Sequence, residues 1–424
     1  MREMKDSGIE LIGNIPENWT IKRIKHLFSI FSGATPQSAV EDYWDGDVLW
    51  ITPADYKTKD KYVYGGKRNI SFIGLKSCSA TMIPKGSIIF SKRAPIGTVA
   101  INNNELATNQ GCLSCVPNSN CCAEFYYYFM SIYTEVFELL GSGTTFKEIS
   151  ASSFMNVALP YPNLLEQQAI SNFLNRKCTE ISSITTDIQT HINMLEQYKR
   201  SLITEVVTKG LNSDVKMKEY PSQWVQSIPS SWRLLRFKYI ATVKSNLVEP
   251  DNYGDWPQVS PDNIVKDAGI LLPCGTVEEA GIISGNHLFK KGQILYSKIR
   301  PKLNKVVIAP FNGLCSADMY PIETTQNYRF LKYAMLSDYF VSQVALITED
   351  RVKMPKINQD ELGEITVVMP GLEEQQHIAD YLDDKCSVID GIIVVLREQL
   401  DTLSKYKESV IYEYVTGKKE VPVA

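Results

Sequence analysis

One phrase occurs twice in this chain, and that repetition limits the possible folds more than any other feature. The phrase reads LEQQAISNFL in residues 165–174 and EEQQHIADYL in residues 373–382. Other segments match in the same order along both halves. They are MKDSGIELIGNIPENW (4–19) with MKEYPSQWVQSIPSSW (217–232), KGSIIFSKRAP (85–95) with KGQILYSKIRP (291–301), and LEQYKRSLITEVVT (195–208) with LSKYKESVIYEYVT (403–416). Ordered repeats at this spacing indicate an internal duplication, with about 210 residues in each half.

The repeated phrase opens a long helix-like segment in each half. Apolar residues recur there at every seventh position, as in helices that pack together along their length. We call these the a positions: Leu174, Ile181, Ile188, Leu195 and Leu202 in the first half, and Leu382, Ile389, Leu396, Leu403 and Val410 in the second. Two separate amphipathic helices, each packed on its own domain, are the alternative explanation of this spacing.

A second set of positions, three residues after or four residues before an a position, is partly polar. We call these the d positions: Ile170, Lys177, Ile184, His191, Tyr198 and Glu205 in the first half, and Ile378, Lys385, Ile392, Gln399, Tyr406 and Glu413 in the second. Polar residues inside a helix interface are a known means of fixing its register. Because the polar interruptions recur at the same places in both halves, they favour two helices that pack against each other.

The connection between the halves determines how these helices run. Only residues 210–229 join the first helix to the second globular part, so that part must lie at the far end of the first helix. The second helix must then run back, and the N-terminal segment is expected to complete its end. We therefore predict an α+β protein with pseudo-twofold symmetry, in which a long antiparallel two-helix coiled coil joins two mixed α/β domains like a dumbbell. The expected boundaries are 1–160 and 212–368 for the domains, and 161–211 and 369–424 for the helices.

The bulk composition excludes several classes of protein. A hydrophobic share of 44% and a charged share of 22% are typical of a soluble globular protein. The chain contains no apolar run near the ~20 residues of a membrane span, and MREMKDSGIELIG lacks the apolar core of a secretory signal. Nine cysteines are scattered without a disulfide-like framework, which favours a reducing cytoplasm and no membrane association.

No catalytic or metal-binding motif is convincing. The glycine-rich GSGTT (141–145) follows a helix and lacks the Lys-Ser/Thr of a phosphate loop. Cys112 and Cys115 form a CxxC, but GCLSCVP reads as a buried strand, and no second pair closes a zinc site. Four histidines offer little to a nucleophilic triad. We therefore expect neither catalysis nor a bound cofactor or metal in this chain.

The charge is unevenly distributed. Although the net charge is −4, residues 361–424 hold 13 acidic residues against 6 basic ones, whereas residues 20–155 and 230–360 are mildly basic. Phosphate binding requires a local positive face rather than a positive total. The distribution is therefore compatible with a nucleic-acid partner but does not require one.

Several segments carry a specific family resemblance. FSGATPQ (31–37) followed by YWDGDVLWITPADY (43–56) resembles the start of a target-recognition domain in type I restriction–modification specificity subunits. GTTFKEISASSFMNVALPYPNLLEQQAISNFL (143–174) is similar to that family's passage from recognition domain to spacer helix. The second half departs from the pattern at VKSNLVEPDNYGDWPQVSPDNI (243–264) and LITEDRVKMPKIN (346–358), which weakens any transfer of residue roles to that half.

The resemblance implies a non-catalytic subunit that recognises a bipartite, asymmetric sequence in double-stranded DNA. Each globular domain would read one half-site, and the helices would set the gap between them. The subunit would position two modification (methyltransferase) subunits, which would bind S-adenosylmethionine. ATP and magnesium would belong to restriction subunits, where the system has them.

The candidate DNA contacts are basic and hydroxyl residues in matched loops beside strands and at the entry to each helix. They are Lys92, Arg93, Thr144, Thr145 and Lys147 in the first half, and Lys298, Arg300, Lys302, Lys305, Arg351, Lys353 and Lys356 in the second. Such residues contact phosphates, which position a protein without specifying sequence. A solvated charged loop is the alternative for each of them, and the sequence does not select the residues that read bases.

Two other functions remain open at this stage: a scaffold that binds no DNA, and a specificity subunit of a methylation-only system. A self-sufficient methyltransferase or nuclease is disfavoured, because the chain lacks an Asn-Pro-Pro-aromatic tetrapeptide and a Walker pair.

Overall fold

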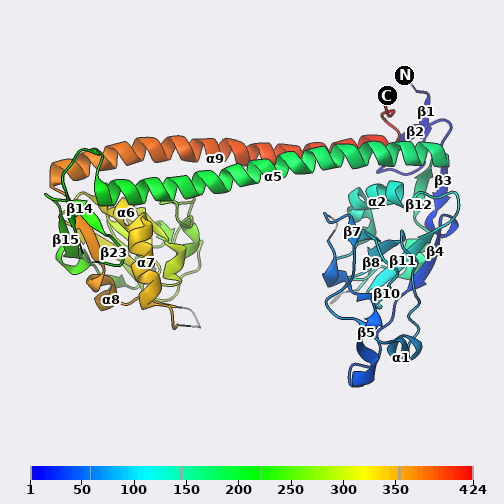
Figure 1. Cartoon of the computed structure of the whole chain (residues 1–424), viewed down its shortest axis with the longest axis horizontal. Coiled ribbons are helices and arrows are strands. Elements are labelled where there is room, and N and C mark those ends of the chain that lie inside the picture. The colour runs from blue at the N-terminus through cyan, green and yellow to red at the C-terminus, as the bar shows by residue number, and fades with distance from the viewer. Residues whose placement is uncertain (1, 58, 144–146, 221, 352–354, 423–424) are drawn as a thin grey trace. The chain divides into compact units, whose positions relative to one another are not determined.

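The computed structural model describes residues 2–57, 59–143, 147–220, 222–351 and 355–422 (Figure 1). The chain forms two compact units. Unit 1 contains the residues up to Asp187 together with those from Gln399 onward, and unit 2 contains Ile188–Glu398. Each unit therefore consists of one mixed α/β domain and parts of two long helices, α5 (Leu164–Lys209) and α9 (Leu372–Val415).

The domain of unit 1 is built on a five-stranded sheet, in which only the β7–β9 pair is parallel. The strands follow the order β4 (Phe28–Ser32), β11 (Cys112–Pro117), β8 (Ile88–Ser91), β9 (Val99–Asn102) and β7 (Tyr62–Val63). Smaller pairs are β1 (Met4–Asp6) with β2 (Asn14–Pro16), β3 (Thr20–Arg23) with β12 (Ala158–Tyr161), and β6 (Trp50–Ile51) with β10 (Ala107–Thr108). Other elements include β5 (Trp44–Val48), α1 (Phe72–Lys76), α2 (Ala123–Ile132), α3 (Thr134–Leu139) and α4 (Ala151–Met155).

The domain of unit 2 has two four-stranded sheets. The first follows the order β16 (Ala241–Val243), β23 (Met319–Thr324), β20 (Ile294–Ser297) and β21 (Val306–Ile308). The second follows the order β17 (Leu247–Val248), β19 (Asn286–Phe289), β22 (Gly313–Cys315) and β18 (Gln258–Val259). Other elements are β13 (Met217–Glu219) paired with β14 (Ser227–Pro229), β15 (Arg233–Arg236) paired with β24 (Thr366–Met369), and the helices α6 (Tyr328–Leu336), α7 (Asp338–Ile347) and α8 (Gln359–Glu364).

The core of unit 1 lies between the sheet, α2 and the long helices (Figure 1). Phe125, Tyr126 and Phe129 of α2 are buried, and Phe90 of β8 packs edge-on against Phe137 of α3. Cys112 and Cys115 are buried in β11, as predicted from GCLSCVP. The aromatic run of α2 is therefore part of the core.

The repeated phrase attaches each long helix to its own domain. The buried side chain of Gln167 accepts a hydrogen bond from the Cys122 backbone N–H (2.8 Å) and donates one to the Pro162 carbonyl (2.8 Å). In unit 2, Gln375 accepts from the Asn327 N–H (3.0 Å) and donates to the Pro370 carbonyl (3.0 Å). The first Gln of each LEQQ/EEQQ segment therefore fixes the start of α2 or α6 to its long helix. The second Gln, Gln168 or Gln376, is exposed.

The two long helices run antiparallel within each unit. In unit 1 the Phe173 ring lies 4.4 Å from the Tyr414 ring, and Lys407 Nζ donates to Ser182 Oγ (3.3 Å). In unit 2, Lys199 Nζ lies 2.7 Å from Asp390 Oδ2. Because residue numbers rise along α5 as they fall along α9, the antiparallel pairing predicted from sequence is confirmed.

The a positions lie in the interface, whereas the prediction for the d positions is wrong. All ten a positions are buried or half-buried. Of the d positions only Ile170 and Ile378 are buried, while Ile184, Tyr198 and Tyr406 are 47%, 57% and 54% exposed. The second set of buried or half-buried residues instead follows each a position by four residues. It comprises Cys178, Thr185, Ile192, Lys199 and Val206 on α5, and Cys386, Ile393, Leu400, Lys407 and Tyr414 on α9.

The d positions were misassigned because a second set of residues recurs every seven positions whether it follows the a positions by three residues or by four. The apolar a positions alone therefore do not decide on which side of them the partner helix lies. Lys199 obscures the answer, because a lysine that is only 5% exposed reads in the sequence as a surface residue.

The hydrogen bonds of Gln167 give a testable prediction. Gln167→Met removes them but keeps a similar volume, which leaves the Cys122 N–H without its side-chain partner. We expect the chain to lose about 1–3 kcal/mol of stability and the calorimetric unfolding transition to move to lower temperature. The matched control is Gln168→Met at the exposed neighbouring position, which should change stability by less than about 0.5 kcal/mol. Equal effects of both substitutions would contradict this role.

Candidate nucleic-acid interface

The loops that follow β8 and β20 have the same construction. Ser91 Oγ donates to the Arg93 carbonyl (2.8 Å), and Ser297 Oγ donates to the Ile299 carbonyl (3.0 Å). In each unit a second segment, which comes shortly before the long helix in the chain, lies against this loop. Its backbone contacts are Ile149 N–H to the Lys92 carbonyl in unit 1 and Ile357 N–H to the Lys298 carbonyl in unit 2, both at 3.0 Å. The matched SK segments therefore occupy equivalent places.

In unit 1 one carboxylate holds both loop cations. Glu148 contacts Lys92 Nζ at 2.8 Å through Oε1 and Arg93 at 3.4 Å through Oε2. Lys147 is exposed next to this cluster. The structure thus brings Lys92, Arg93 and Lys147 together, but with an acidic partner that the sequence analysis did not identify. Thr144 and Thr145 lie outside the described residues.

In unit 2 the equivalent position carries the opposite charge. Lys356 pairs with Ile299 in the way that Glu148 pairs with Arg93, and its ammonium lies 3.0 Å from Asp318. Lys298 lies 5.4 Å from the centre of the Tyr320 ring. Arg300 and Lys302 are exposed, and neither forms an ion pair with any residue that the structure describes.

Two candidates of unit 2 have structural partners instead. Lys305 is largely buried and donates to the Pro261 carbonyl (2.7 Å). Arg351 forms a two-pronged contact with Glu361, with 3.1 Å between Arg351 Nη1 and Glu361 Oε2. The guanidinium holds the pKa of the Glu361 carboxyl below its ordinary value, and Glu361 in turn caps the start of α8. Lys353 falls outside the described part of the chain.

Unit 2 also contains three buried polar side chains, of which His287 lies near Lys298. His287 Nδ1, Asn286 Oδ1 and Asn304 Nδ2 have no hydrogen-bond partner among the described residues. Burial and the nearby Lys298 charge lower the pKa of His287, which favours the neutral imidazole. Asn304 has a φ of 44°, in the left-handed region that asparagine tolerates. No sequence motif marks these three residues.

The candidate interface offers basic side chains on loops. Among the residues that the structure describes, no group of three or more His, Cys, Asp or Glu side chains is arranged to hold a metal ion. No helix within the same residues is long and apolar enough to cross a membrane.

Comparison with known proteins identifies the architecture. A family model described as the type I restriction modification DNA specificity domain matches residues 16–194 and again residues 237–393. The two matches cover most of the chain, one in each half. The chain belongs to this family. It is a DNA specificity subunit, and the two repeated domains are target-recognition domains.

Two relatives show how far the similarity extends. The specificity subunit is 40% identical over 167 residues to the type I restriction enzyme MjaIX specificity subunit of Methanocaldococcus jannaschii, an alignment that covers 39% of each chain. It is 28% identical over 310 residues to the type I restriction enzyme EcoDI specificity subunit of Escherichia coli, which covers 70% of each chain.

Solved structures share the fold over nearly the whole length. One match is a chain from a structure of complex assembly and conformational transition of the type I R-M system, with a TM-score of 0.72 and 13% identity, covering 96% of this chain and 99% of that one. The HsdS subunit from Thermoanaerobacter tengcongensis gives a TM-score of 0.50 with 14% identity, covering 96% of this chain and 98% of that one.

The shared carboxylate of unit 1 leads to paired predictions on DNA binding. Replacing Lys92 and Arg93 together by Met should weaken binding to all duplexes and flatten the salt dependence by about two units, with the target sequence unchanged. Glu148→Gln should act in the opposite direction, because it frees both cations, and should tighten binding by about 0.5–1 kcal/mol.

Fluorescence anisotropy of labelled duplexes across a salt series measures both effects. Glu105→Gln is the matched control, since it removes one exposed negative charge from another loop of the same domain. If the Lys92/Arg93 variant changes the target sequence and leaves the salt dependence intact, these residues read bases rather than phosphates.

Proposed function

We propose that this specificity subunit recognises a bipartite, asymmetric DNA sequence and positions two methyltransferase subunits on it. Each unit would contact one half-site through the loop cluster after β8 or β20. The contrast between Glu148 and Lys356 supports unlike half-sites, because equivalent backbone positions present opposite charges. The subunit itself would be non-catalytic and cytoplasmic. S-adenosylmethionine would bind the methyltransferase subunits, and ATP with magnesium would bind restriction subunits where the system has them.

The exposed d positions support the presence of two equivalent partners. Ile184 and Tyr406 are 47% and 54% exposed in unit 1, and Ile392 and Tyr198 are 44% and 57% exposed in unit 2. The contacts of Ser182 with Lys407 and of Lys199 with Asp390 set a register that brings each Ile to the level of the Tyr on the other helix. Each unit thus presents one exposed Ile and one exposed Tyr at the same level of its helix pair, which we call its Ile–Tyr patch. Exposed apolar residues repeated in both halves are suited to binding two copies of one protein.

The decisive experiment is a genome-wide map of modified adenines with this gene intact and with it deleted. We expect the deletion to remove one split motif, with two short half-sites around a fixed gap. An unchanged map, together with no salt-sensitive binding of the assembled complex to duplex DNA, would instead favour a scaffold that binds no DNA.

The Ile–Tyr patches predict the stoichiometry of the complex. Ile184→Glu combined with Tyr406→Glu should reduce the number of bound methyltransferase subunits from two to one, because burying new carboxylates at an apolar contact is costly. Native mass spectrometry of the co-expressed complex counts the subunits. Ser183→Glu with Ser409→Glu adds the same charge at other exposed positions of the same helices and should leave two bound. Two subunits retained by both variants would place the partner surface elsewhere.

A further inference from the structure

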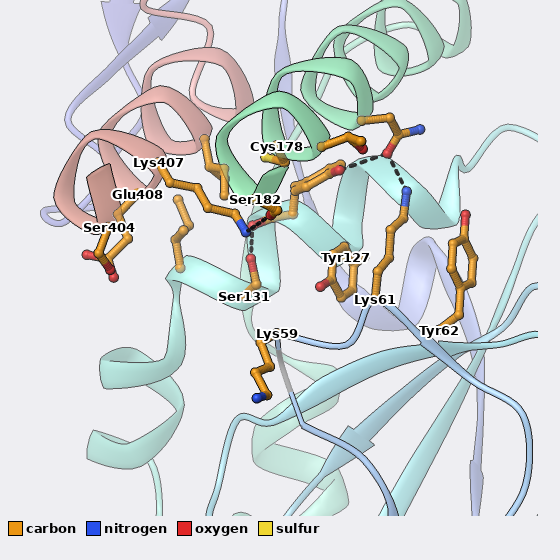
Figure 2. Close-up of a pocket in the computed structure, with 15 residues that line it drawn as sticks. Lys59, Lys61, Tyr62, Tyr127, Ser131, Cys178, Ser182, Ser404, Lys407 and Glu408 are labelled. Atoms are coloured by element: carbon orange, nitrogen blue, oxygen red, sulfur yellow. Dashed lines mark hydrogen bonds between the residues drawn. The ribbon is translucent and has the colours of Figure 1, made fainter. Parts of the chain in front are cut away.

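Unit 1 contains a cavity of about 630 Å³ between its recognition domain and its helix pair (Figure 2). Its walls come from α2, from the segment leading into β7, and from α5 and α9. Its lining carries the charged side chains of Lys59, Lys61, Lys407 and Glu408, with Tyr127 and Ser182 among the neutral ones. The volume falls within the range of roughly 300–1,000 Å³ that is usual for small-molecule sites.

Comparison of the two halves shows that Lys407 lacks the carboxylate partner of its counterpart in unit 2. Lys199 and Lys407 occupy the same place in the repeat, at the fifth position of LEQYKRSLITEVVT and of LSKYKESVIYEYVT. In unit 2, Asp390 accepts two hydrogen bonds from Lys199 Nζ, at 2.8 and 2.7 Å. In unit 1 the equivalent partner of Lys407 is the neutral Ser182, at 3.3 Å. The half-buried Lys407 forms no ion pair with any described residue, and its ammonium faces the cavity beside Ser182 and Ser131 (Figure 2).

The space around this lysine is also specific to unit 1. The Tyr128 hydroxyl donates to Asn175 (2.8 Å), and the Tyr333 hydroxyl donates to Asp383 (2.6 Å), which identifies α2 and α6 as equivalent helices. At the equivalent places, unit 2 has Lys332 where unit 1 has Tyr127, and Leu336 where unit 1 has Ser131. Lys332 lies 3.6 Å from Asp383, and Leu336 is buried in the core of unit 2. Smaller residues at Ser131 and Ser182 therefore leave room in unit 1 that larger ones occupy in unit 2.

A second lysine of the cavity is already neutralised. Lys61 Nζ lies 3.1 Å from Glu124 and also contacts the Asn175 side-chain oxygen. Burial lowers the pKa of Lys61 despite this carboxylate. Two lysines of the lining, Lys407 and the exposed Lys59, form no ion pair with a described residue and are available to a ligand. The Ser182 hydroxyl lies beside Lys407, while Tyr127, Ile132 and Ile411 supply apolar surface. A lysine ammonium combined with a hydroxyl is suited to a phosphate group.

We propose that Lys407 and Ser182 form an anion site that binds the phosphate group of a nucleotide unit, free or within DNA, in the cavity of unit 1. This function goes beyond sequence recognition by the loops after β8 and β20. The phosphate has two possible sources, a free nucleotide or the backbone of bound DNA. Unit 2 has no equivalent capacity at Lys199, because Asp390 provides the negative charge from within the chain.

Calorimetric titration of the full chain tests the site with four probes: pyrophosphate, ADP, adenosine, and a duplex of unrelated sequence. The key variant is Ser182→Asp, which reproduces in unit 1 the lysine–aspartate pair of unit 2 and is expected to preserve or raise the melting temperature. It should weaken phosphate binding by about tenfold or more. Lys407→Met should have the same effect. Lys405→Met is the matched control, because Lys405 is exposed and pairs with Asp401 on its own helix.

The pattern of binding identifies the source of the phosphate. Binding of pyrophosphate and ADP but not adenosine, lost in Ser182→Asp and kept in Lys405→Met, would establish a free-nucleotide site. Binding of the duplex alone, weakened by Ser182→Asp and Lys407→Met, would assign the phosphate to the DNA backbone. The proposal is overturned if none of the phosphate-bearing probes binds, or if a correctly folded Ser182→Asp protein binds them as the unaltered chain does.

Discussion

The contact between α5 and α9 is the interaction on which both units depend. Neither domain packs on a single helix, because each core contains residues of both. In unit 1, Phe173 and Leu174 of α5 lie in the same cluster as Val410, Tyr414 and Val415 of α9. In unit 2, Ile203 and Val207 share a cluster with Ile378 and Leu382. Burial of these apolar side chains supplies the driving force, and the Lys199–Asp390 pair adds a directional contact to it.

The duplication has kept the positions of contacts while changing their chemistry. Glu124 and Asn175 in unit 1 correspond to Arg329 and Asp383 in unit 2. In unit 1, hydrogen bonds from Tyr62 and Asn175 and the nearby Lys61 lower the pKa of Glu124, although burial opposes this. If each domain were placed on the helices of the other, Glu124 would face Asp383 and two carboxylates would be in contact. Arg329 would face Asn175 and would lose its anionic partners. At this contact each domain therefore carries the charge that suits its own helix.

The repeat made much of the fold predictable from sequence. The connection through residues 210–229 required antiparallel helices, and the seven-residue spacing located one buried set of residues. The second set was misplaced because it includes Lys199 and Thr185, whose polar side chains give no sign of burial. The candidate interface was only partly predictable. The matched SK segments identified the loops, but the contact of Glu148 with Lys92 joins residues far apart in the chain, and no local pattern signals it. Likewise, the ion pair of Arg351 with Glu361 gives that arginine a structural role which composition does not reveal.

The division of the chain into units has a consequence for biosynthesis. Unit 2 is a single continuous stretch, Ile188–Glu398, whereas unit 1 needs both the beginning of the chain and the residues from Gln399 onward. The N-terminal strands pack against the last turns of α9, where the Tyr412 hydroxyl donates to the Leu11 and Ile12 carbonyls (both 3.3 Å). Domains generally fold as units during synthesis. The domain of unit 1 is therefore synthesised before unit 2 but completed after it, and the part of its apolar surface that faces α9 stays uncovered while unit 2 is made.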